Sequence, residues 1–482
     1  MTSIDMLPDD VLLEIFDIYV YEHPSDGVFF KGEIEEWQTL VHVCRRWRSV
    51  VFGSPRRLNL RLVCTATTPA RDTLDLWPSL PLFILIPIPI SDLDIGRDSA
   101  PPERTEDVDE ILAVLKRIDR VVKIHLLNVN DSDLEDILAA MQVPFPELTD
   151  LQIRSPDGKV AIPDSFLDGS APPLESLLLN HVPFPGLPKL LLSAPHLVYL
   201  HLVTIPHSGY ISPEAMVTAV STLTNLDYLS LEFESPRSRP DWASRPPPPL
   251  TRFVLPVLRY FSFKGVGEYL DDFVACFDAP RLKISRIAFF NQIIFDTPQF
   301  TQFISRAPSL KALEKAKVRF MDGASRVSLS SQTPGYGVLS VEIPCIELDW
   351  QVSSMEQVCT SCLSLSTLED LYIHKHSHST PVWQDNIENA LWLELLQPFT
   401  AVKNLYLCEK FTSHIMPALQ ELVGGRTTEV LPILQNIFLK ELQPSGTLQA
   451  CIQQFVTTRQ ANRHPIAVSR WDHSEEDMAT YD

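Results

Sequence analysis

The sequence is poor in the glycine patterns that mark nucleotide-binding loops and catalytic turns. Only 16 of 482 residues are glycine, and none belongs to a phosphate-cradling loop. A Gly-x-Ser-x-Gly turn and a His-Glu-x-x-His helix are missing as well. A catalytic triad assembled across the fold stays open, because serine, histidine and aspartate are plentiful, but no pattern indicates one. We therefore expect a protein that is not an enzyme, with no catalytic residue and no cofactor.

Positive charge and long apolar runs are also scarce. The 40 Lys and Arg residues face 61 Asp and Glu, a net charge of -21 that repels phosphate backbones, so we expect no nucleic-acid partner. The longest apolar run, Leu80 to Ile90, contains three prolines and is shorter than the roughly 20 residues that cross a bilayer. Asp5, Asp9 and Asp10 stand where a signal peptide needs a basic start. The expectation is a protein without membrane contact, in the cytoplasm or the nucleus.

The cysteines and histidines form no complete metal site. Most of the 8 cysteines lie in apolar runs, which favours free thiols in a reducing compartment. Cys359 and Cys362 have the spacing of a redox or zinc half-site, but no matching second pair follows, so incidental thiols are favoured. His374, His376 and His378 alternate and could bind a metal adventitiously. A solvated strand end is the preferred interpretation of these histidines, and we expect no metal.

Residues 1–55 have the pattern of a compact helical unit. Pro8 and the two aspartates after it suit a first helical turn. Apolar residues at helical spacing then form two stripes, the first from Val11, Leu12, Ile15, Phe16 and Tyr19, the second from Leu40, Val43, Cys44, Trp47, Val50 and Val51. Two stripes in so short a segment make a marginal core. The remaining apolar face should be covered by another protein or by the following domain.

Most of the chain repeats the element apolar-x-x-apolar-x-apolar. The last two positions of each copy lie two residues apart, so in a short strand they point to one face, which stacked copies bury together. The copies are Val121/Ile124/Leu126, Leu148/Leu151/Ile153, Leu174/Leu177/Leu179, Leu197/Leu200/Leu202, Leu226/Leu229/Leu231, Leu258/Phe261/Phe263, Ile343/Ile346/Leu348, Leu368/Leu371/Ile373, Val402/Leu405/Leu407 and Leu434/Ile437/Leu439, with a weaker one at Ile284/Ile287/Phe289. Spacings of 26, 23 and 29 residues from Leu151 to Leu177, Leu200 and Leu229 fall in the range of leucine-rich repeats.

Helix-like stretches separate these strands, so the predicted fold class is α/β: a helical unit, then a leucine-rich-repeat solenoid of curved parallel strands with helices outside. The stretches are Val108 to Ile118, Leu134 to Met141, Pro213 to Leu223 and Leu270 to Phe277. The expected parts are a helical domain at 1–55, a strand-containing connection at 56–107, the solenoid at 108–470 and an acidic, disordered tail at 471–482. Polar or proline-rich insertions are expected at Ser91 to Asp107, Ser235 to Pro249 and Asp322 to Val338. An ordinary doubly wound domain is the alternative.

The N-terminal segment resembles the F-box. The resemblance lies in Leu7-Pro8-Asp-Asp-Val11-Leu12-Leu-Glu-Ile15-Phe16 and, further on, Leu40-Val-His-Val43-Cys44-Arg-Arg-Trp47-Arg. The whole chain is similar to the fungal family of F-box-like proteins with degenerate leucine-rich repeats, up to its Ile466 to Trp471 end. The resemblance implies a Skp-type adaptor and, through it, a cullin–RING ubiquitin ligase, with the repeats selecting an unknown target protein. It also implies adaptor-facing or supporting roles for Leu7, Pro8, Leu12, Ile15, Phe16, Val43, Cys44 and Trp47.

The sequence departs from the family pattern in two places. The segment from Tyr21 to Glu36 is longer than in compact F-boxes, so we expect a different arrangement of the helices, and the repeats lack the asparagine that usually follows each strand. We expect the stabilising side-chain ladder of regular horseshoes to be missing. Candidate target contacts on the concave strand face are Gln152, Tyr199, Tyr228, Arg259 and Tyr406, although any solvated strand face would look alike. Rival interpretations are an interaction scaffold outside any ligase and an enzyme with an unmarked site.

Overall fold

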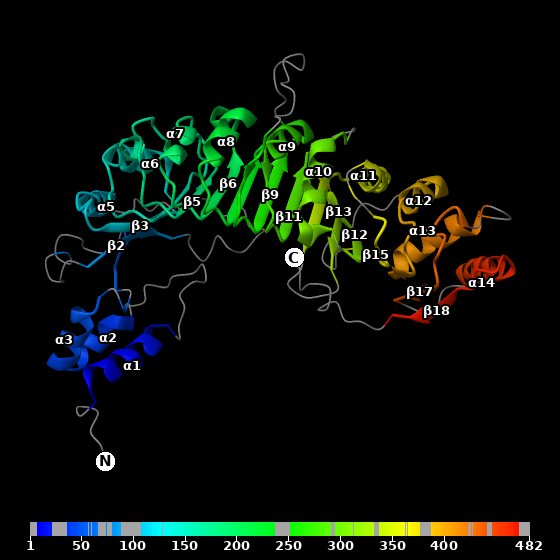
Figure 1. The fold of residues 1–482 in the computed structure, drawn as a ribbon, viewed down its shortest axis with the longest axis horizontal. Helices are drawn as coiled ribbons and strands as arrows, with labels where there is room; N and C mark the ends of the chain where they lie inside the picture. The colour runs from blue at the N-terminus through cyan, green and yellow to red at the C-terminus, as the bar shows by residue number, and fades with distance from the viewer. Residues whose placement is uncertain are drawn as a thin grey trace. The chain divides into compact units, whose positions relative to one another are not determined.

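The protein divides into two compact units, Met1–Leu223 and Thr224–Asp482, each described by itself below. A computed structural model describes most of the chain (Figure 1). The described residues are 7–21, 36–55, 57–58, 60–65, 74, 80–87, 108–127, 129–236, 251–290, 295–311, 313–331, 337–361, 363, 365–375, 387–422, 426, 428–440 and 446–471.

The first unit begins with three helices: α1 (Asp9–Tyr21), α2 (Glu36–Val43) and α3 (Arg45–Gly53). Helix α1 starts directly after Pro8, with Asp9 and Asp10 in its first turn, where negative charge is favoured. Leu12 and Phe16 have no exposed surface, and the Phe16 ring lies 4.7 Å from that of Trp47. The three helices therefore share a small core of their own.

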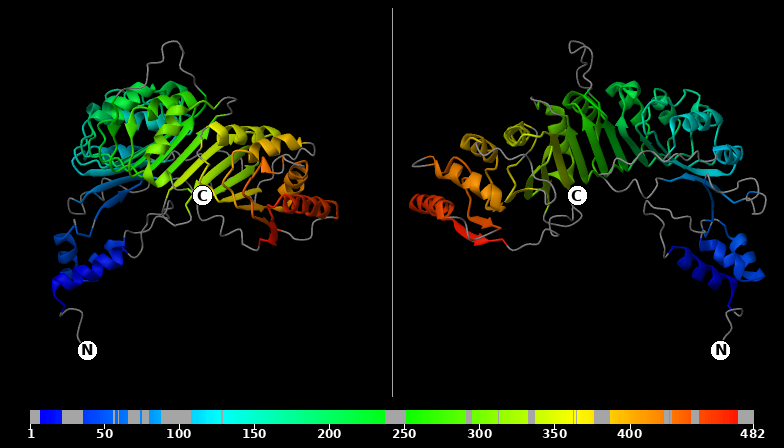
Figure 2. Two further views of the ribbon diagram at one scale, coloured as in Figure 1. Left: turned by 45° about the vertical axis from the view of Figure 1, so that its right-hand side comes forward. Right: turned by 180° about the vertical axis from the view of Figure 1, so that it is seen from behind.

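The rest of the first unit is a parallel sheet with helices on one face (Figures 1 and 2). Its strands pair in sequence order: β1 (Leu62–Cys64), β2 (Leu82–Ile86), β3 (Val121–Leu126), β4 (Asp150–Arg154), β5 (Ser176–Asn180) and β6 (Tyr199–Ile205). The helices are α5 (Val108–Leu115), α6 (Asp131–Ala140), α7 (Leu187–Leu192) and α8 (Pro213–Val220), with short turns η3 (Phe166–Gly169) and η4 (His207–Gly209).

The repeated apolar positions meet across these strands as the sequence predicts. Leu151 pairs with Leu177, and Leu177 with Leu200, all fully buried beneath the helices. Since each strand adds the same buried positions to the row, one continuous core forms although no single repeat could bury its own stripe. The mixed α/β class and the parallel sheet are confirmed, and they are consistent with a leucine-rich-repeat-like stack.

The second unit is also a sheet with helices on one face. Its strands follow the spatial order β7 (Tyr228–Phe233), β9 (Tyr260–Gly265), β11 (Ile284–Phe289), β14 (Val338–Pro344), β13 (Ala324–Ser330), β12 (Lys315–Met321), β15 (Asp370–Lys375), β16 (Asn404–Leu407), β17 (Asn436–Leu439) and β18 (Ala467–Arg470). The helices are α9 (Gly267–Val274), α10 (Pro298–Arg306), α11 (Leu348–Ser361), α12 (Asn389–Leu396), α13 (Glu409–Gln420) and α14 (Gly446–Ala461), with a short turn η6 (Pro308–Leu310). Two further strands, β8 (Phe253–Val254) and β10 (Phe277–Asp278), pair with each other.

The segment expected as a polar insertion at Asp322 to Val338 instead contains a strand of the sheet. Strand β13 runs through it and pairs antiparallel with both β12 and β14. The buried residues of β13, Ser325, Val327 and Leu329, alternate with half-buried ones, which is the period of a strand. Asp322 and Gly323 form the two-residue loop between β12 and β13, a dipeptide typical of tight hairpins. The prediction was wrong because polar composition concealed this alternation.

Two of the predicted repeat copies are also wrong in detail. Ile346 is 64% exposed and Leu348 begins α11, so the motif Ile343/Ile346/Leu348 runs past the end of β14. The strand buries Leu339, Val341 and Ile343 instead. In β11 the residue paired with Phe261 is Ser285, so the weak copy at Ile284/Ile287/Phe289 is shifted by two residues. A fully buried serine at a leucine position hides the repeat from pattern analysis.

Some sequence expectations concern residues outside the described part of the chain. These are Cys362, His376, His378, most of the insertions at Ser91 to Asp107 and Ser235 to Pro249, and the acidic residues 472–482. Their described neighbours are placed: Cys359 is buried within α11, and His374 is 6% exposed in β15. The expectation of a solvated strand end is therefore wrong for His374.

Candidate interaction surfaces

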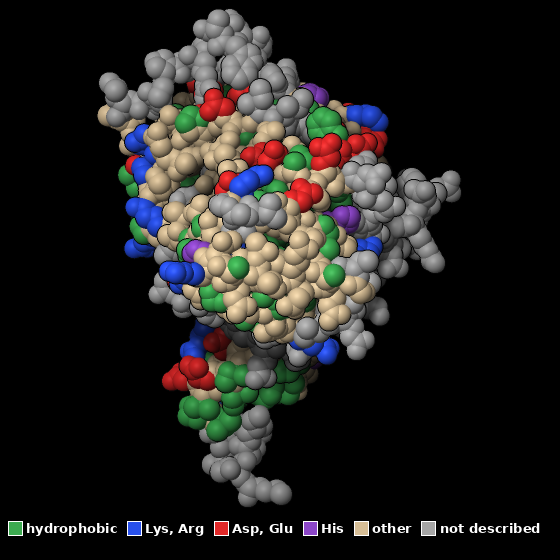
Figure 3. Space-filling view, turned by 90° about the vertical axis from the view of Figure 1, so that its right-hand side faces the viewer, with side chains coloured by type: hydrophobic (Ala, Val, Ile, Leu, Met, Phe, Trp, Pro, Cys, Tyr) green, Lys and Arg blue, Asp and Glu red, His purple; other side chains and the backbone are tan. Residues whose placement is uncertain are grey.

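Helix α1 carries a stripe of exposed apolar side chains beside its buried ones. Val11, Ile15 and Ile18 follow one another at spacings of four and three residues, which places them on one helical face. Each is at least 41% exposed, whereas Leu12 and Phe16, one position further on, are fully buried. The segment thus keeps an apolar face outside after its own core is complete. Figure 3 shows hydrophobic side chains gathered on this helical part, at the bottom of the view.

Val43, at the end of α2, is another exposed apolar side chain of the helical segment, and α1 contacts the residues on either side of it. Asp9 at the start of α1 forms an ion pair with Arg46 at 2.7 Å, and Tyr19 near its end lies 3.3 Å from the hydroxyl of Thr39. Helix α1 therefore runs antiparallel to the chain direction from Thr39 to Arg46. Val43 lies one turn after Thr39, and Ile15 one turn before Tyr19. Val43 is 59% exposed.

The structure separates the eight residues predicted to contact or support an adaptor. Pro8, Ile15 and Val43 are exposed, whereas Leu12 and Phe16 belong to the core beneath them. The other three, Leu7, Cys44 and Trp47, are half-buried, and the Cys44 sulfur accepts a hydrogen bond from the backbone amide of Trp47 at the start of α3. Val11 and Ile18 were not among the predicted site residues, although their helical spacing with Ile15 is visible in the sequence. We call the exposed set Val11, Ile15, Ile18, Tyr19 and Val43 the apolar stripe.

The open face of the first unit, opposite its helices, holds a polar cluster around Asp150. Its carboxylate lies 3.2 Å from Nε2 of His125 and 3.4 Å from Nζ of Lys123, with the Gln152 amide at 3.5 Å. Burial raises the pKa of Asp150, but the His125 contact and the positive charges of His125 and Lys123 outweigh it, so the pKa lies below its usual value. Gln152 is thus a partner within this cluster. Tyr199, two strands away, bonds to His201 at 3.2 Å.

Stacked aromatic rings line two parts of the open face in the second unit. Tyr228 stacks on Tyr260 with ring centroids 4.2 Å apart. Tyr406 lies between Tyr372 at 4.1 Å and Phe438 at 4.5 Å, which continues the stack across three strands. Of the predicted target contacts, Tyr228 and Tyr406 therefore belong to these stacks.

Two features of this unit qualify the sequence predictions about its open face. The Trp471 ring packs on both Tyr372 and Tyr406, with centroids within 5.7 Å, and covers part of that stack. Arg259 does not lie on a strand as expected: it precedes β9 by one residue, and its guanidinium pairs with Asp227 at 2.7 Å. This ion pair holds the Arg259 side chain just before the start of β9.

A side-chain ladder, which the sequence led us not to expect, runs along the last repeats. The Asn404 amide donates to Asp370 at 2.7 Å and accepts from the Asn436 amide at 2.7 Å. These residues open their strands, whereas the asparagine sought in the sequence follows the strand. The expectation of a missing ladder was therefore wrong for this stretch, because the hydrogen bonds form at another position of the repeat.

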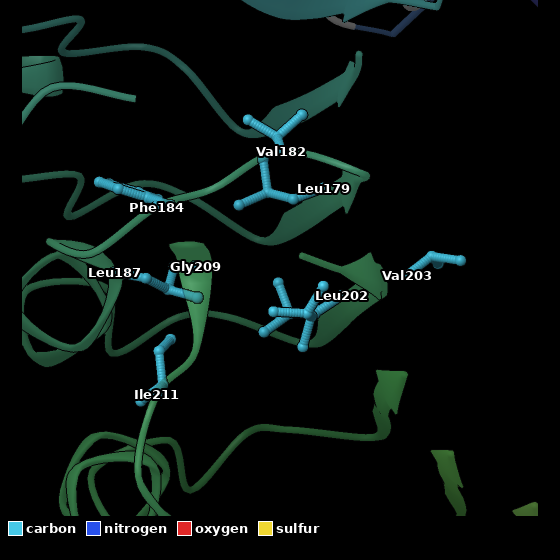
Figure 4. Close-up of a pocket in the computed structure, with 9 residues that line it drawn as sticks. Leu179, Val182, Phe184, Leu187, Leu202, Val203, Gly209 and Ile211 are labelled. Atoms are coloured by element: carbon cyan, nitrogen blue, oxygen red, sulfur yellow. The ribbon is translucent and has the colours of Figure 1, made fainter. Parts of the chain in front are cut away.

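One pocket among the described residues of the first unit is small and apolar. An apolar pocket between the ends of β5 and β6 and helix α7 has a volume of about 10 Å³, room for one water molecule (Figure 4). Its walls include Leu179, Phe184, Leu202 and Ile211, which are apolar. In the described parts of the chain, no group of three His, Cys, Asp or Glu side chains is placed to hold a metal ion. Nor does any described helix have the length and apolar character needed to cross a membrane.

Comparison with known proteins adds little to this picture. No protein-family model matches the sequence, and no curated protein matches it. Among solved structures, the chain is similar to the leucine-rich repeat-containing protein LegL7 from Legionella pneumophila, at 12% identity over 74% of this chain and 95% of that chain, with a TM-score of 0.25. A TM-score this low supports no conclusion, so the assignment of a repeat-like parallel sheet depends on the strand registers described above.

Proposed function

We propose that this chain is the substrate-recruiting subunit of a cullin–RING ubiquitin ligase. In this proposal the helices α1 to α3 bind a Skp-type adaptor, and the repeat sheets hold the target protein. The observation that carries it is the apolar stripe, which stays exposed although the core below it, at Leu12 and Phe16, is complete. The F-box-like sequence of the same helices suggests the partner. The adaptor and the ligase place the protein in the cytoplasm or the nucleus.

The apolar stripe has the character of the centre of a protein–protein interface. Covering the exposed part of each aliphatic side chain stabilises a complex by about 1 kcal/mol, so several together make a useful anchor. Polar neighbours on the same helices, among them Asp10 and Arg45, are exposed and suit a solvated rim. Adjacent exposed apolar side chains on one helical face are unfavourable in water, which favours a protein partner that covers them over a surface left exposed to solvent.

The mechanism that we propose is geometric. A target held on the repeats and an adaptor held on the helices bring the target near a ubiquitin-charged enzyme supplied by the ligase. The gain in rate then comes from a raised local concentration and from orientation, and no residue of this chain needs to react with the target. The proposal therefore assigns this chain no catalytic residue and no cofactor.

The test is co-purification of the full chain with a Skp-type adaptor, using Ile15→Asp to disrupt the stripe. A charge at this position must be desolvated on docking, so adaptor binding should fall at least about tenfold. Val143→Asp is the matched control, because Val143 is 42% exposed against 41% for Ile15 and lies outside the helical segment. Thermal unfolding of both variants should match that of the unaltered chain. Leu12 and Phe16 are unsuitable targets, because a charge there disrupts the core.

Two outcomes would contradict the proposal. Full adaptor binding by the Ile15→Asp variant would show that the stripe is not the docking face. A failure of the unaltered chain to bind any Skp-type adaptor would favour the second candidate, an interaction scaffold outside a ligase. That candidate is supported by the repeat-like sheet with its open faces and requires nothing of the stripe.

A further inference from the structure

Positive charge gathers on the open face of five adjacent strands, β9, β11, β14, β13 and β12, in a chain of net charge -21. The residues of these strands alternate between the core and the open face, so the open-face positions follow from the register. One carboxylate, Glu342, stands at these positions. The cations there, which we call the basic strip, are Lys264, Arg286, Lys315, Lys317 and Arg326. Arg319 also stands on this face but is buried, with 4% of its surface exposed.

The centre of the strip is a row of short hydroxyl side chains between two of the cations. Across the strands Ser262 pairs with Arg286, Arg286 with Ser340, Ser340 with Ser328, and Ser328 with Lys317. The Ser328 and Ser340 hydroxyls lie 3.1 Å apart. Ser262 and Ser340 are each only 8% exposed and Ser328 is half-buried, so the Ser328 hydroxyl is the more accessible one, and a hydroxyl both donates and accepts hydrogen bonds.

Neighbouring side chains hold parts of the strip in place. The Arg286 guanidinium lies over the ring of Tyr260, 5.8 Å from its centroid, and is exposed on its other side. Arg326 on β13 donates a hydrogen bond from Nε to the carboxylate of Glu342, its pairing partner on β14, at 2.8 Å. The one carboxylate of this face is therefore held by Arg326. A charge whose position is already fixed loses less conformational entropy when a ligand binds.

We propose that the basic strip binds an acidic, extended segment of the target protein. Five strands about 4.8 Å apart span roughly 19 Å, which is the length of about six extended residues. Carboxylates of such a segment would meet Arg286 and Lys317, and its backbone would meet the half-buried Ser328 hydroxyl between them. The inference rests on the proposed function only in taking the segment to belong to a target.

The size of the strip favours an acidic peptide over nucleic acid. Charges are screened beyond about 8 Å at physiological ionic strength, so a short peptide experiences the strip rather than the net negative charge of the chain. A nucleic acid carries phosphates at regular intervals over its whole length and would extend beyond the strip into acidic surroundings. A short acidic segment meets no such repulsion.

The experiment measures fluorescence anisotropy of a labelled peptide of alternating glutamate and serine with the full chain. Arg286→Glu should weaken binding by about tenfold, because it reverses an exposed charge at the centre of the strip. Arg281→Glu is the matched control: Arg281 is exposed in the same unit, five positions earlier and outside any strand, and its variant should bind as the unaltered chain does. A peptide with glutamine in place of glutamate should not bind.

A chain ending at Trp471 distinguishes the sources of the acidic segment. If only this shortened chain binds the peptide, the acidic residues 472–482 of the chain itself fill the strip, and the inference about a target is overturned. Absence of binding by both chains, or equal loss in both arginine variants, also overturns it. Adaptor co-purification that persists in such a case would leave the proposed function intact, so the two failures are distinguishable.

Discussion

At the scale of a single residue, the charge of Asp150 on the open face is stabilised by side chains from its own strand and from the neighbouring one. The carboxylate is half-buried on β4, between His125 on the neighbouring strand and Gln152 on its own. The sequence named Gln152 as a candidate contact from strand alternation alone. It could not reveal the cluster, because His125 and Asp150 meet only through the pairing of β3 with β4.

This cluster predicts a pH dependence of stability. The pKa of Asp150 is lower in the folded state than in the unfolded chain, so its contribution is fully present above the unfolded value near 3.9 and is lost as pH falls through the folded value. Asp150→Asn should lower the free energy of unfolding at neutral pH by about 1 kcal/mol. Below pH 4 the difference should shrink, as measured by chemical denaturation at a series of pH values.

Asp157 supplies the control for that experiment. It is exposed and pairs with Lys159 at 2.8 Å, and such surface pairs contribute little. Asp157→Asn should therefore leave both the stability and its pH dependence nearly unchanged. Equal pH profiles for the unaltered chain and Asp150→Asn would contradict the role given to Asp150.

At the scale of elements, the hairpin between β12 and β13 depends on one backbone conformation. Gly323 has φ +82°, a region that residues with a side chain rarely adopt, and an added Cβ would meet nothing within 4 Å. Gly323→Ala should therefore destabilise the protein through conformation alone, by about 1 kcal/mol. Equilibrium unfolding in urea measures the change.

Gly53, the last residue of α3, provides a comparison without strain. An added Cβ there also meets nothing within 4 Å, but the backbone does not have a positive φ. Gly53→Ala should be neutral or stabilising by a few tenths of a kcal/mol. A loss of stability at Gly53 as large as at Gly323 would show that the left-handed conformation is not the cause.

Most individual strands could be predicted from the sequence, but which strands lie next to each other in the sheet could be predicted only in part. Leucines two residues apart, such as Leu177 and Leu179, predict a strand because an extended segment places both on one face. The order β11-β14-β13-β12-β15 could not be derived from the sequence. The strands β12, β13 and β14 are inserted in reverse order, so that β14 lies beside β11 and β12 lies beside β15. Asp322-Gly323 was the local signal for that hairpin.

At the scale of the whole molecule, the two proposed surfaces belong to different compact units. Ile15→Asp should weaken adaptor binding and leave binding of the acidic peptide unchanged, whereas Arg286→Glu should weaken peptide binding and leave adaptor binding unchanged. In the double variant both losses should appear with their single-variant sizes, because residues that share no partner act additively. Adaptor co-purification and peptide anisotropy on the same preparations measure both, and a loss of adaptor binding in Arg286→Glu would contradict this separation.

The sequence by itself determined the repeated strand–helix pattern and the helical start of the chain, because both follow from the spacing of apolar residues along a few turns or strands. Only the tertiary structure decided that Leu12 is covered while Ile15 is exposed, and that cations from four strands form one strip. The physical reason is the same in both cases. Burial and charge clustering depend on which segments, distant in sequence, lie side by side, and local periodicity carries no information about that pairing.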